Sequence, residues 1–250
     1  MAKMGSTRKR CSHFTAAVKL LALLQRNSIG RNSLTAMFTY NPEIFSVGDE
    51  AQAKAIILTA ENSTTQARWE QETPFLCSLI RGQIALGADS VILDYGCGIG
   101  RLAKALIEGY GCRVIGVDIS PSMRSLSVGY VNSDRFFACA PEMLGFLVDQ
   151  GLRFDLAISI WVLQHCLSPA VDIQLLRDAL KPGGRLFVAN NVHRVVPTKE
   201  GGWVSDGIDI KATLAKAFTS RSGEMLWSPD VPSNLSGITY WAAFEKKAGG

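Results

Sequence analysis

Short apolar runs alternate with segments of helical spacing in most of the chain after residue 90. The apolar runs predict strands buried on both faces, and they fall at residues 90–95, 113–118, 135–138, 154–160 and 185–190. The segments between them place apolar side chains on one helical face, and they fall at residues 101–109, 121–129, 142–150 and 169–180. Strands and helices that alternate at these lengths predict an α/β fold with a doubly wound, mostly parallel, Rossmann-like sheet.

The tail departs from this alternation. Residues 192–208 contain several glycines and prolines, and they are a candidate lid because they follow the carboxyl end of the fifth strand. A helix is predicted at 209–218, and strand-like segments follow at 224–228 and 238–245. We expect the last two to form a C-terminal antiparallel hairpin that completes a seven-stranded sheet, so that residues 90–250 make one domain.

The region before the first strand is predicted to be helical. Residues 50–60 and 64–86 have helical spacing, and we expect the second helix to break near Pro74. Residues 37–89 are therefore interpreted as an N-terminal helical cap. Residues 1–36 are basic, rich in serine and threonine and free of acids, which fits a transit peptide, a poor secretory signal or a flexible extension. We favour the flexible extension.

A glycine-rich turn lies between the first strand and the first helix after it. Its sequence is Asp94-Tyr-Gly-Cys-Gly-Ile-Gly100, with glycines at alternate positions. Glycine permits a sharp turn and lets a ligand approach the main chain closely. The second strand ends in Asp118, 20 residues after Gly98. This spacing fits one βαβ unit whose second strand presents a carboxylate to ribose hydroxyls.

With these motifs the chain resembles the class I S-adenosylmethionine-dependent methyltransferases, whose pattern is an acid, one residue and then Gly-x-Gly-x-Gly. Three further segments follow in the order that the family shows, at residues 117–123, 154–159 and 180–188, and the resemblance covers roughly residues 65–191. It implies S-adenosylmethionine as cofactor. It also implies methyl transfer to an O, N or C atom of a small-molecule acceptor.

The resemblance implies a role for each residue of the glycine turn. Gly96, Gly98 and Gly100 would pass under the methionine part of the cofactor. Asp94 would order the turn near the cofactor's amino group. Asp118 would accept hydrogen bonds from the two ribose hydroxyls, which an ionised acceptor makes stronger.

Other cofactor contacts are implied further along the chain. Ile119 would pack on the adenine ring, and Ser159 would face the methionine end. The family often has an acid where this chain has Cys139, so we expect backbone groups around Cys139 and Ala140 to bind adenine instead. Arg68, before the first strand, is a candidate partner for the cofactor's carboxylate.

Two histidines are candidate catalytic bases. Methyl transfer needs an aligned acceptor and the exclusion of water, and a base helps when the acceptor is a hydroxyl or an ammonium. His165 follows the fourth strand and His193 follows the fifth, both on the expected ligand side. The alternatives stay open, because His165 could pack or cap the next helix and His193 could be a solvated loop residue.

Charge and motif patterns limit the partners. Residues 1–36 hold seven basic residues and no acid, which leaves 19 basic and 22 acidic residues in the rest of the chain. A mildly acidic body argues against nucleic acid as a partner. The stretch 159–162 also lacks the Asn/Asp-Pro-Pro-aromatic segment that base-modifying methyltransferases carry there. No apolar stretch is long enough for a membrane span, so no membrane partner is expected.

The cysteines do not suggest a metal site. The chain has six, and none are spaced as a Cys-x-x-Cys pair. We therefore expect reduced cysteines and a cytoplasmic protein, unless residues 1–36 direct it to an organelle.

Two other functions stay open. A NAD(P)-dependent oxidoreductase on a Rossmann fold would use Asp118 equally well, although Arg101 stands where its fingerprint has a third glycine. A non-catalytic S-adenosylmethionine-binding protein would keep the same cofactor residues.

Overall fold

The structure is a computed structural model that describes residues 38–58, 64–222, 225–226 and 239–247. The chain divides into two compact units, Met1–Phe38 and Thr39–Gly250, and the described helices and strands all belong to the second. The predicted extension 1–36 lies outside the described residues. So do the turn of the predicted C-terminal hairpin and parts of the three predicted segments 50–60, 224–228 and 238–245.

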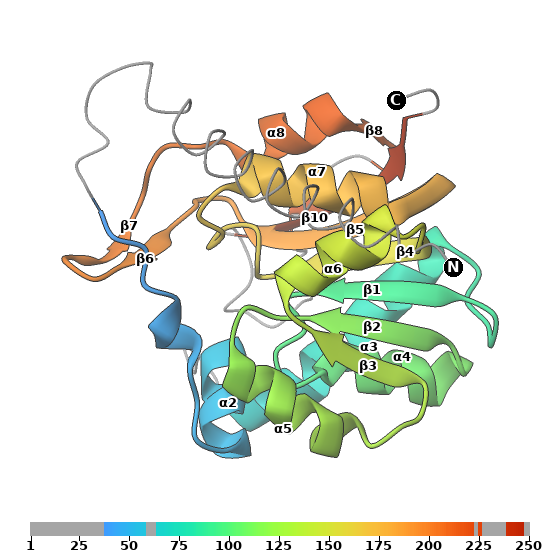
Figure 1. Cartoon of the computed structure of the whole chain (residues 1–250), viewed down its shortest axis with the longest axis horizontal. Helices are drawn as coiled ribbons and strands as arrows, with labels where there is room; N and C mark the ends of the chain where they lie inside the picture. Colours follow the sequence, from blue (N-terminus) through green and yellow to red (C-terminus); the bar gives the residue numbers. More distant parts are fainter. Residues whose placement is uncertain (1–37, 59–63, 223–224, 227–238, 248–250) are drawn as a thin grey trace, which may run out of the picture. The chain divides into compact units, whose positions relative to one another are not determined.

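A mostly parallel sheet forms the centre of this unit (Figure 1). Its parallel strands are β3 (Phe136–Cys139), β2 (Arg113–Val117), β1 (Val91–Tyr95), β4 (Phe154–Ile160) and β5 (Leu180–Asn191), in that spatial order. β10 (Thr239–Lys246) then pairs antiparallel with β5. Two short strands, β8 (Phe218–Ser220) and β9 (Met225–Leu226), pair antiparallel with different parts of β10. The spatial order β3-β2-β1-β4-β5-β10-β8 has seven strands, and the pairing is antiparallel beyond β5. This arrangement confirms the predicted fold class.

Strand order reverses between β1 and β4. The chain builds β1, β2 and β3 in one direction and then returns to place β4 and β5 on the other side of β1. In such sheets ligands bind beyond the carboxyl ends of the strands at the point of reversal. The carboxyl ends of β1, β2 and β4 are therefore where a site is expected.

Helices cover both faces of the sheet. The described helices are η1 (Pro42–Phe45, a 3-10 turn), α2 (Glu50–Ile57), α3 (Thr65–Gln83), α4 (Arg101–Tyr110), α5 (Pro121–Val131), α6 (Pro141–Asp149), α7 (Pro169–Ala179) and α8 (Ile210–Ala217). Alternate residues of each buried strand point to opposite faces, so Ile92 and Leu93 enter different cores.

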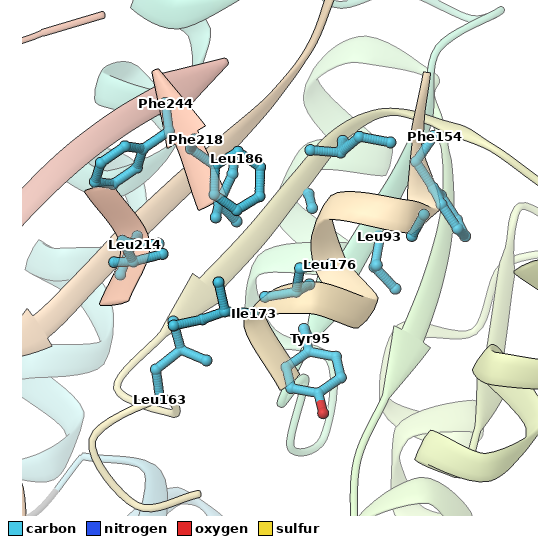
Figure 2. Packing of buried hydrophobic residues seen from close by; sticks show 14 of the residues in the cluster. Leu93, Tyr95, Phe154, Leu163, Ile173, Leu176, Leu186, Leu214, Phe218 and Phe244 are labelled. Carbon is cyan, nitrogen blue, oxygen red and sulfur yellow. The ribbon is translucent and has the colours of Figure 1, made fainter. Parts of the chain in front are cut away.

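The two faces have separate apolar cores. One core joins the strands to α3 and α4 through Leu76, Ile80 and Leu106. The other joins them to α6, α7 and α8, and Figure 2 shows part of it, including Leu176 from α7 and Leu214 from α8. Each fully buried leucine or isoleucine stabilises the fold by about 1.5–3 kcal/mol. This burial on both sides explains why the strands are continuously apolar rather than alternating.

Some boundaries differ from the sequence predictions. The predicted break at Pro74 is wrong: α3 runs through Pro74, because Leu76 and Ile80 beyond it are fully buried against the sheet. β5 begins at Leu180 rather than at residue 185, because Leu180 pairs with Phe154 before the register shifts. Phe218, predicted to end a helix, begins β8 and packs against Phe244.

The connection between β5 and α8 contains a small hairpin of its own. β6 (Val196–Thr198) and β7 (Gly202–Val204) pair antiparallel, and Thr198 also bridges to Tyr40. Figure 1 shows this hairpin on the side toward which β1, β2 and β3 point. None of the described helices combines the length and the hydropathy that crossing a membrane requires.

Candidate functional site

The glycine turn lies at the carboxyl end of β1. Gly96, Gly98 and Gly100 have φ angles of 81°, 54° and 85°, in the left-handed region that other residues avoid. The backbone N–H groups of Gly96 and Cys97 both donate to the carbonyl of Val117, at 2.7 and 3.0 Å. The turn is thereby fixed to the end of β2 with its main chain close to the ligand side of the sheet.

Asp118 holds this turn from the tip of β2. Its Oδ2 accepts from the backbone N–H of Gly98 at 2.8 Å, and its Oδ1 accepts from that of Ser120 at 2.8 Å. Burial raises the pKa of Asp118, and the hydrogen bonds from Ser120 and Gly98 only partly offset this rise. Ile119 follows with 44% of its surface exposed, so a flat apolar ring can pack on it. The predicted juxtaposition of Asp118 with the glycine turn is confirmed.

Three buried side chains at the strand ends have polar atoms without hydrogen-bond partners among the described residues. Within the part of the chain that the structure describes, Oδ2 of Asp94, Oγ of Ser159 and both amide atoms of Asn190 have none. Burial raises the pKa of Asp94 to about 7, although Arg101 lowers it. Unsatisfied buried polar groups are costly, so a polar ligand or water that reaches them stabilises the site. These residues, with Asp118 and the glycine turn, fit a polar nucleoside such as S-adenosylmethionine.

The third strand ends beside this site. Cys139 is buried at the end of β3, and its carbonyl accepts from the backbone N–H of Asp118 at 3.2 Å. Ala140 follows as the residue before α6. Cys139 thus lies next to Asp118, and the predicted contact of Cys139 and Ala140 with adenine stays a prediction.

Arg68 belongs to a buried charged cluster. Its Nε donates to Oε1 of Glu72 at 2.7 Å, one turn along α3. Oε2 of Glu72 lies 3.8 Å from Nη1 of Arg101, at the start of α4. The guanidinium of Arg101 also lies 5.3 Å from the ring centre of Trp69. Glu72 and Arg101 were not predicted from the sequence, because nothing local distinguishes them from surface charges. The predicted role of Arg68 toward the cofactor's carboxylate stays a prediction.

Comparison with known proteins agrees with this geometry. The family model described as a methyltransferase domain matches residues 67–206, more than half of the chain. The chain belongs to the class I S-adenosylmethionine-dependent methyltransferases. Its mostly parallel sheet and the glycine turn after β1 agree with this membership.

Curated relatives cover part of this methyltransferase. It is 32% identical over 117 residues to a ubiquinone biosynthesis O-methyltransferase of Coxiella burnetii (strain Dugway 5J108-111), a match over 46% of this chain and 48% of that protein. A protein of the same description from Chelativorans sp. (strain BNC1) is 32% identical over 99 residues, 39% of each chain. This methyltransferase spans about half the length of the curated relatives that it matches.

Solved structures share its fold. The PH0226 protein from Pyrococcus horikoshii OT3 aligns with a TM-score of 0.56 and 20% identity, over 80% of this chain and all of that one. The N-methyltransferase NodS from Bradyrhizobium japonicum WM9, in complex with S-adenosyl-L-homocysteine, aligns with a TM-score of 0.55 and 19% identity, over 78% and 97% of the chains. At these identities the likeness concerns the fold alone.

The turn after β4 connects the methyltransferase's glycine turn to His165. A Cβ placed on Gly96 would lie 2.0 Å from Cγ2 of Val162, so the side chain of Val162 packs directly on the main chain of Gly96. The backbone N–H of His165 donates to the carbonyl of Val162 at 2.8 Å. Trp161, directly after β4, has a φ of 62°, a strained conformation for a large side chain. His165 is thus held one tight turn away from the glycine turn.

An aromatic cluster surrounds His165. Its ring centre lies 4.9 Å from that of Trp203 in β7 and 6.3 Å from that of Phe45 in η1. Trp203 is 47% exposed. Three elements distant in sequence therefore build one aromatic wall beyond the carboxyl ends of the strands. We call Phe45, His165 and Trp203 the aromatic wall.

Arg194 fixes the connection that carries Trp203. It is buried, and its guanidinium pairs with both carboxylate oxygens of Asp206, with Nε 2.8 Å from Oδ1 and Nη2 2.9 Å from Oδ2. It also donates to the carbonyls of Leu163 and Leu167 at 3.2 and 3.3 Å. The turn after β4 and the 192–208 connection are thereby joined. The sequence did not identify Arg194.

His193, the other predicted base, is exposed in the bend that follows β5. Its neighbour Arg194 points into the protein instead. A catalytic role for His193 stays a prediction. Within the described residues, no group of three or more His, Cys, Asp or Glu side chains is arranged to hold a metal ion.

Proposed function

We propose that this protein transfers a methyl group from S-adenosylmethionine to a small-molecule acceptor. The observation that carries the proposal is the carboxylate of Asp118, held 2.8 Å from the N–H of Gly98 where strand order reverses. An ionised carboxylate beside an open main chain suits the ribose hydroxyls of a nucleoside. The family match over residues 67–206 supports the same ligand.

The chain's own residues bind and orient this cofactor. Asp118 accepts from the ribose hydroxyls, Ile119 packs on adenine, and Asp94 lies near the methionine end. S-adenosylmethionine supplies a methyl group already activated by its sulfonium. The protein's task is therefore to align the acceptor with that methyl group and to exclude water.

Two side chains close over the glycine turn and serve this exclusion. Cβ atoms placed on Gly96 and Gly98 would lie 2.0 Å from Val162 and 2.6 Å from Cδ1 of Ile57. Apolar side chains from the turn after β4 and from α2 thus reach the main chain of the turn. Reduced access of water favours transfer to the acceptor over hydrolysis of the donor.

We further propose that the acceptor is a planar aromatic molecule and that its methylated atom is oxygen. The aromatic wall offers ring faces and edges to a planar molecule, and its half-exposed Trp203 leaves one such surface accessible. The curated relatives named above are described as O-methyltransferases, which supports oxygen as the acceptor atom. The mildly acidic composition after residue 36 supports a small acceptor over a nucleic acid.

The remaining predictions form part of this proposal. We propose that residues 1–36 are an extension outside the methyltransferase unit, with a helical cap at 37–89 and the cofactor domain at 90–250. We also propose a cytoplasmic location, which the free cysteines support, since Cys77, Cys97, Cys112, Cys139 and Cys166 form no disulfide with one another.

Incubation of the full chain with S-adenosylmethionine labelled in its methyl group tests the activity. A panel of phenols, catechols, amines and carboxylic acids serves as acceptors, and label in the product is measured. The proposal expects transfer to one or more aromatic hydroxyl compounds. Transfer only to amines would contradict the oxygen assignment. Binding of S-adenosylhomocysteine without transfer to any acceptor class would favour the non-catalytic alternative.

A further inference from the structure

The amide of Gln164 has its orientation fixed by the main chain. The side chain of Gln164 is buried, and its Oε1 accepts from the backbone N–H of Asn191 at the end of β5. An N–H group can only donate, so the oxygen of the amide must face Asn191. The amide nitrogen of Gln164 then points toward His165, and Nε2 of Gln164 lies 2.9 Å from Nε2 of His165.

This orientation decides the proton position on His165. The amide nitrogen of Gln164 is a donor, so Nε2 of His165 must accept and carries no proton. The proton therefore sits on Nδ1, which donates to the carbonyl of Val195 at 2.8 Å. One relay thus runs from Asn191 through Gln164 and His165 to Val195. A protonated imidazole would direct a second donor at the amide nitrogen, which the geometry opposes.

The surroundings of His165 also favour its neutral form. Burial lowers the pKa of His165 and the positive charge of Arg194 lowers it further, while the hydrogen bond to Val195 partly opposes them. Arg194 is itself paired with Asp206. The ring of His165 also contacts two aromatic rings, those of Phe45 in η1 and Trp203 in β7.

We propose that Gln164 is a positioning residue that holds His165 as the neutral, Nδ1-protonated imidazole and keeps its ring in the aromatic wall. His165 then acts as a surface for the acceptor rather than as its base. The acceptor-binding role of the aromatic wall rests on the proposed function. The protonation state of His165 rests on the hydrogen-bond geometry alone. It revises the role that the sequence suggested for His165.

The hydrogen bond between Gln164 and His165 affects which acceptors the site favours. Because Nε2 of His165 is already bonded to Gln164, it does not take the proton of an acceptor hydroxyl. An acceptor that binds here therefore loses its proton without this histidine. The inference favours aromatic hydroxyl compounds that ionise readily over aliphatic alcohols.

Nuclear magnetic resonance of the full chain with nitrogen-15 in its histidines tests the proposal without any substrate. The chain has three histidines, and the variants His13→Gln and His193→Gln assign the signals. We expect His165 to show a proton on Nδ1 and a bare Nε2 from pH 6 to pH 8. A proton on Nε2 in the wild type, or titration of His165 near an ordinary imidazole pKa, would overturn the proposal.

Gln164→Glu sharpens the test, because it places an acceptor where the amide nitrogen donated. We expect His165 in this variant to gain a proton on Nε2, with at least about a 10-fold rise in proton affinity, which equals one pKa unit. The matched control is Gln174→Glu on the exposed side of α7, which should leave the His165 signals unchanged. If Gln164→Glu does not fold, Gln164→Met removes the donor to Nε2, and we expect the proton affinity of His165 to rise, because the neutral ring loses this hydrogen bond while Nδ1 keeps its bond to Val195. An unchanged tautomer and pKa in the folded Gln164 variant would contradict the positioning role.

Kinetic measurements of methyl transfer distinguish a failure of this inference from a failure of the proposed function. With an aromatic acceptor found in the panel, Gln164→Glu should raise KM for the acceptor several-fold and leave the affinity for S-adenosylhomocysteine unchanged. Wild-type kcat should show no ionisation assignable to His165. If no acceptor is methylated but the wild-type tautomer is as stated, the proposed function fails and the hydrogen-bond assignment stands.

Discussion

Gly96 and Val162 are in direct contact across the site, so close that a Cβ on Gly96 would lie 2.0 Å from Cγ2 of Val162. This contact sets the distance between the glycine turn after β1 and the turn after β4. The first turn is the predicted cofactor site, and the second leads to His165 and the aromatic wall. The distance between the proposed cofactor and acceptor sites therefore depends on the absence of a side chain at Gly96.

Gly96→Ala tests this contact. The added methyl group overlaps Val162 and is strained at a φ of 81°, so we expect the free energy of unfolding to fall by roughly 2–4 kcal/mol. Chemical denaturation measures this change. The control is Gly129→Ala in α5, where nothing lies within 4 Å of the new Cβ. It should stabilise the helix by about 0.5–1 kcal/mol. Equal effects of the two substitutions would show that the close approach at Gly96 is absent.

Asp118→Asn tests the ribose contact. The amide keeps the shape of the side chain but loses the charge, so we expect the affinity for S-adenosylhomocysteine to fall by about 1–3 kcal/mol, as for hydrogen bonds to a charged group. Isothermal titration calorimetry gives the value. The exposed Asp134 supplies the control, and Asp134→Asn should bind like the wild type. Unaltered affinity in Asp118→Asn would remove Asp118 from the cofactor site.

The part of the site that the sequence predicted is the part with a local signal. Alternating glycines after an apolar strand identify a turn, and an acid at the end of the next strand identifies its partner. The glycine turn and Asp118 come together because the single βαβ unit from β1 to β2 folds as expected. The continuous helix through Pro74 was missed for the opposite reason, because the buried contacts of Leu76 and Ile80 with the sheet override a local preference.

Asp94 predicts a dependence of stability on pH. Burial raises its pKa to about 7 in the folded protein from 3.8. The folded state therefore binds the proton more tightly than the unfolded state, and its stabilising contribution is complete below pH 3.8 and lost as the pH rises through 7. Asp94→Asn carries no such charge. We expect it to become more stable relative to the wild type between pH 4 and pH 7, by roughly 2–4 kcal/mol in all.

Denaturation at several pH values measures this difference. A difference in stability that does not vary with pH would show that Asp94 titrates normally. The exposed Asp149→Asn variant, on α6, gives the baseline for loss of a carboxylate without burial.

The pair of Arg194 and Asp206 predicts a loss of stability when it is broken. The side chain of Arg194 is 2% exposed and that of Asp206 is 25% exposed. Asp206→Asn leaves a buried guanidinium without its charged partner, and we expect a loss of about 1–3 kcal/mol. Hydrogen exchange should show that residues 192–208 open more readily. The pair of Lys54 and Glu50, with side chains 26% and 51% exposed, is the control, since neither charge is fully buried and Glu50→Gln should cost less than about 0.5 kcal/mol. Similar losses in both variants would contradict the joining role of Arg194.

Arg194 and Gln164 could not be predicted, because their partners lie far away in the sequence. Gln164 contacts Asn191, 27 residues further on, and Arg194 contacts the carbonyl of Leu163, 31 residues back. Both contacts depend on how β4 and β5 bring their following turns together. No local pattern encodes that approach, whereas the strands themselves are encoded by their apolar runs.

Titration of the full chain with S-adenosylhomocysteine, and separately with NAD, tests whether the glycine turn and Asp118 bind an S-adenosyl compound. Our interpretation is that they do. It predicts saturable binding of S-adenosylhomocysteine at one site per chain, weakened in Asp118→Asn, and no binding of NAD at the same concentrations. Binding of NAD in place of S-adenosylhomocysteine, or of neither compound, would contradict it.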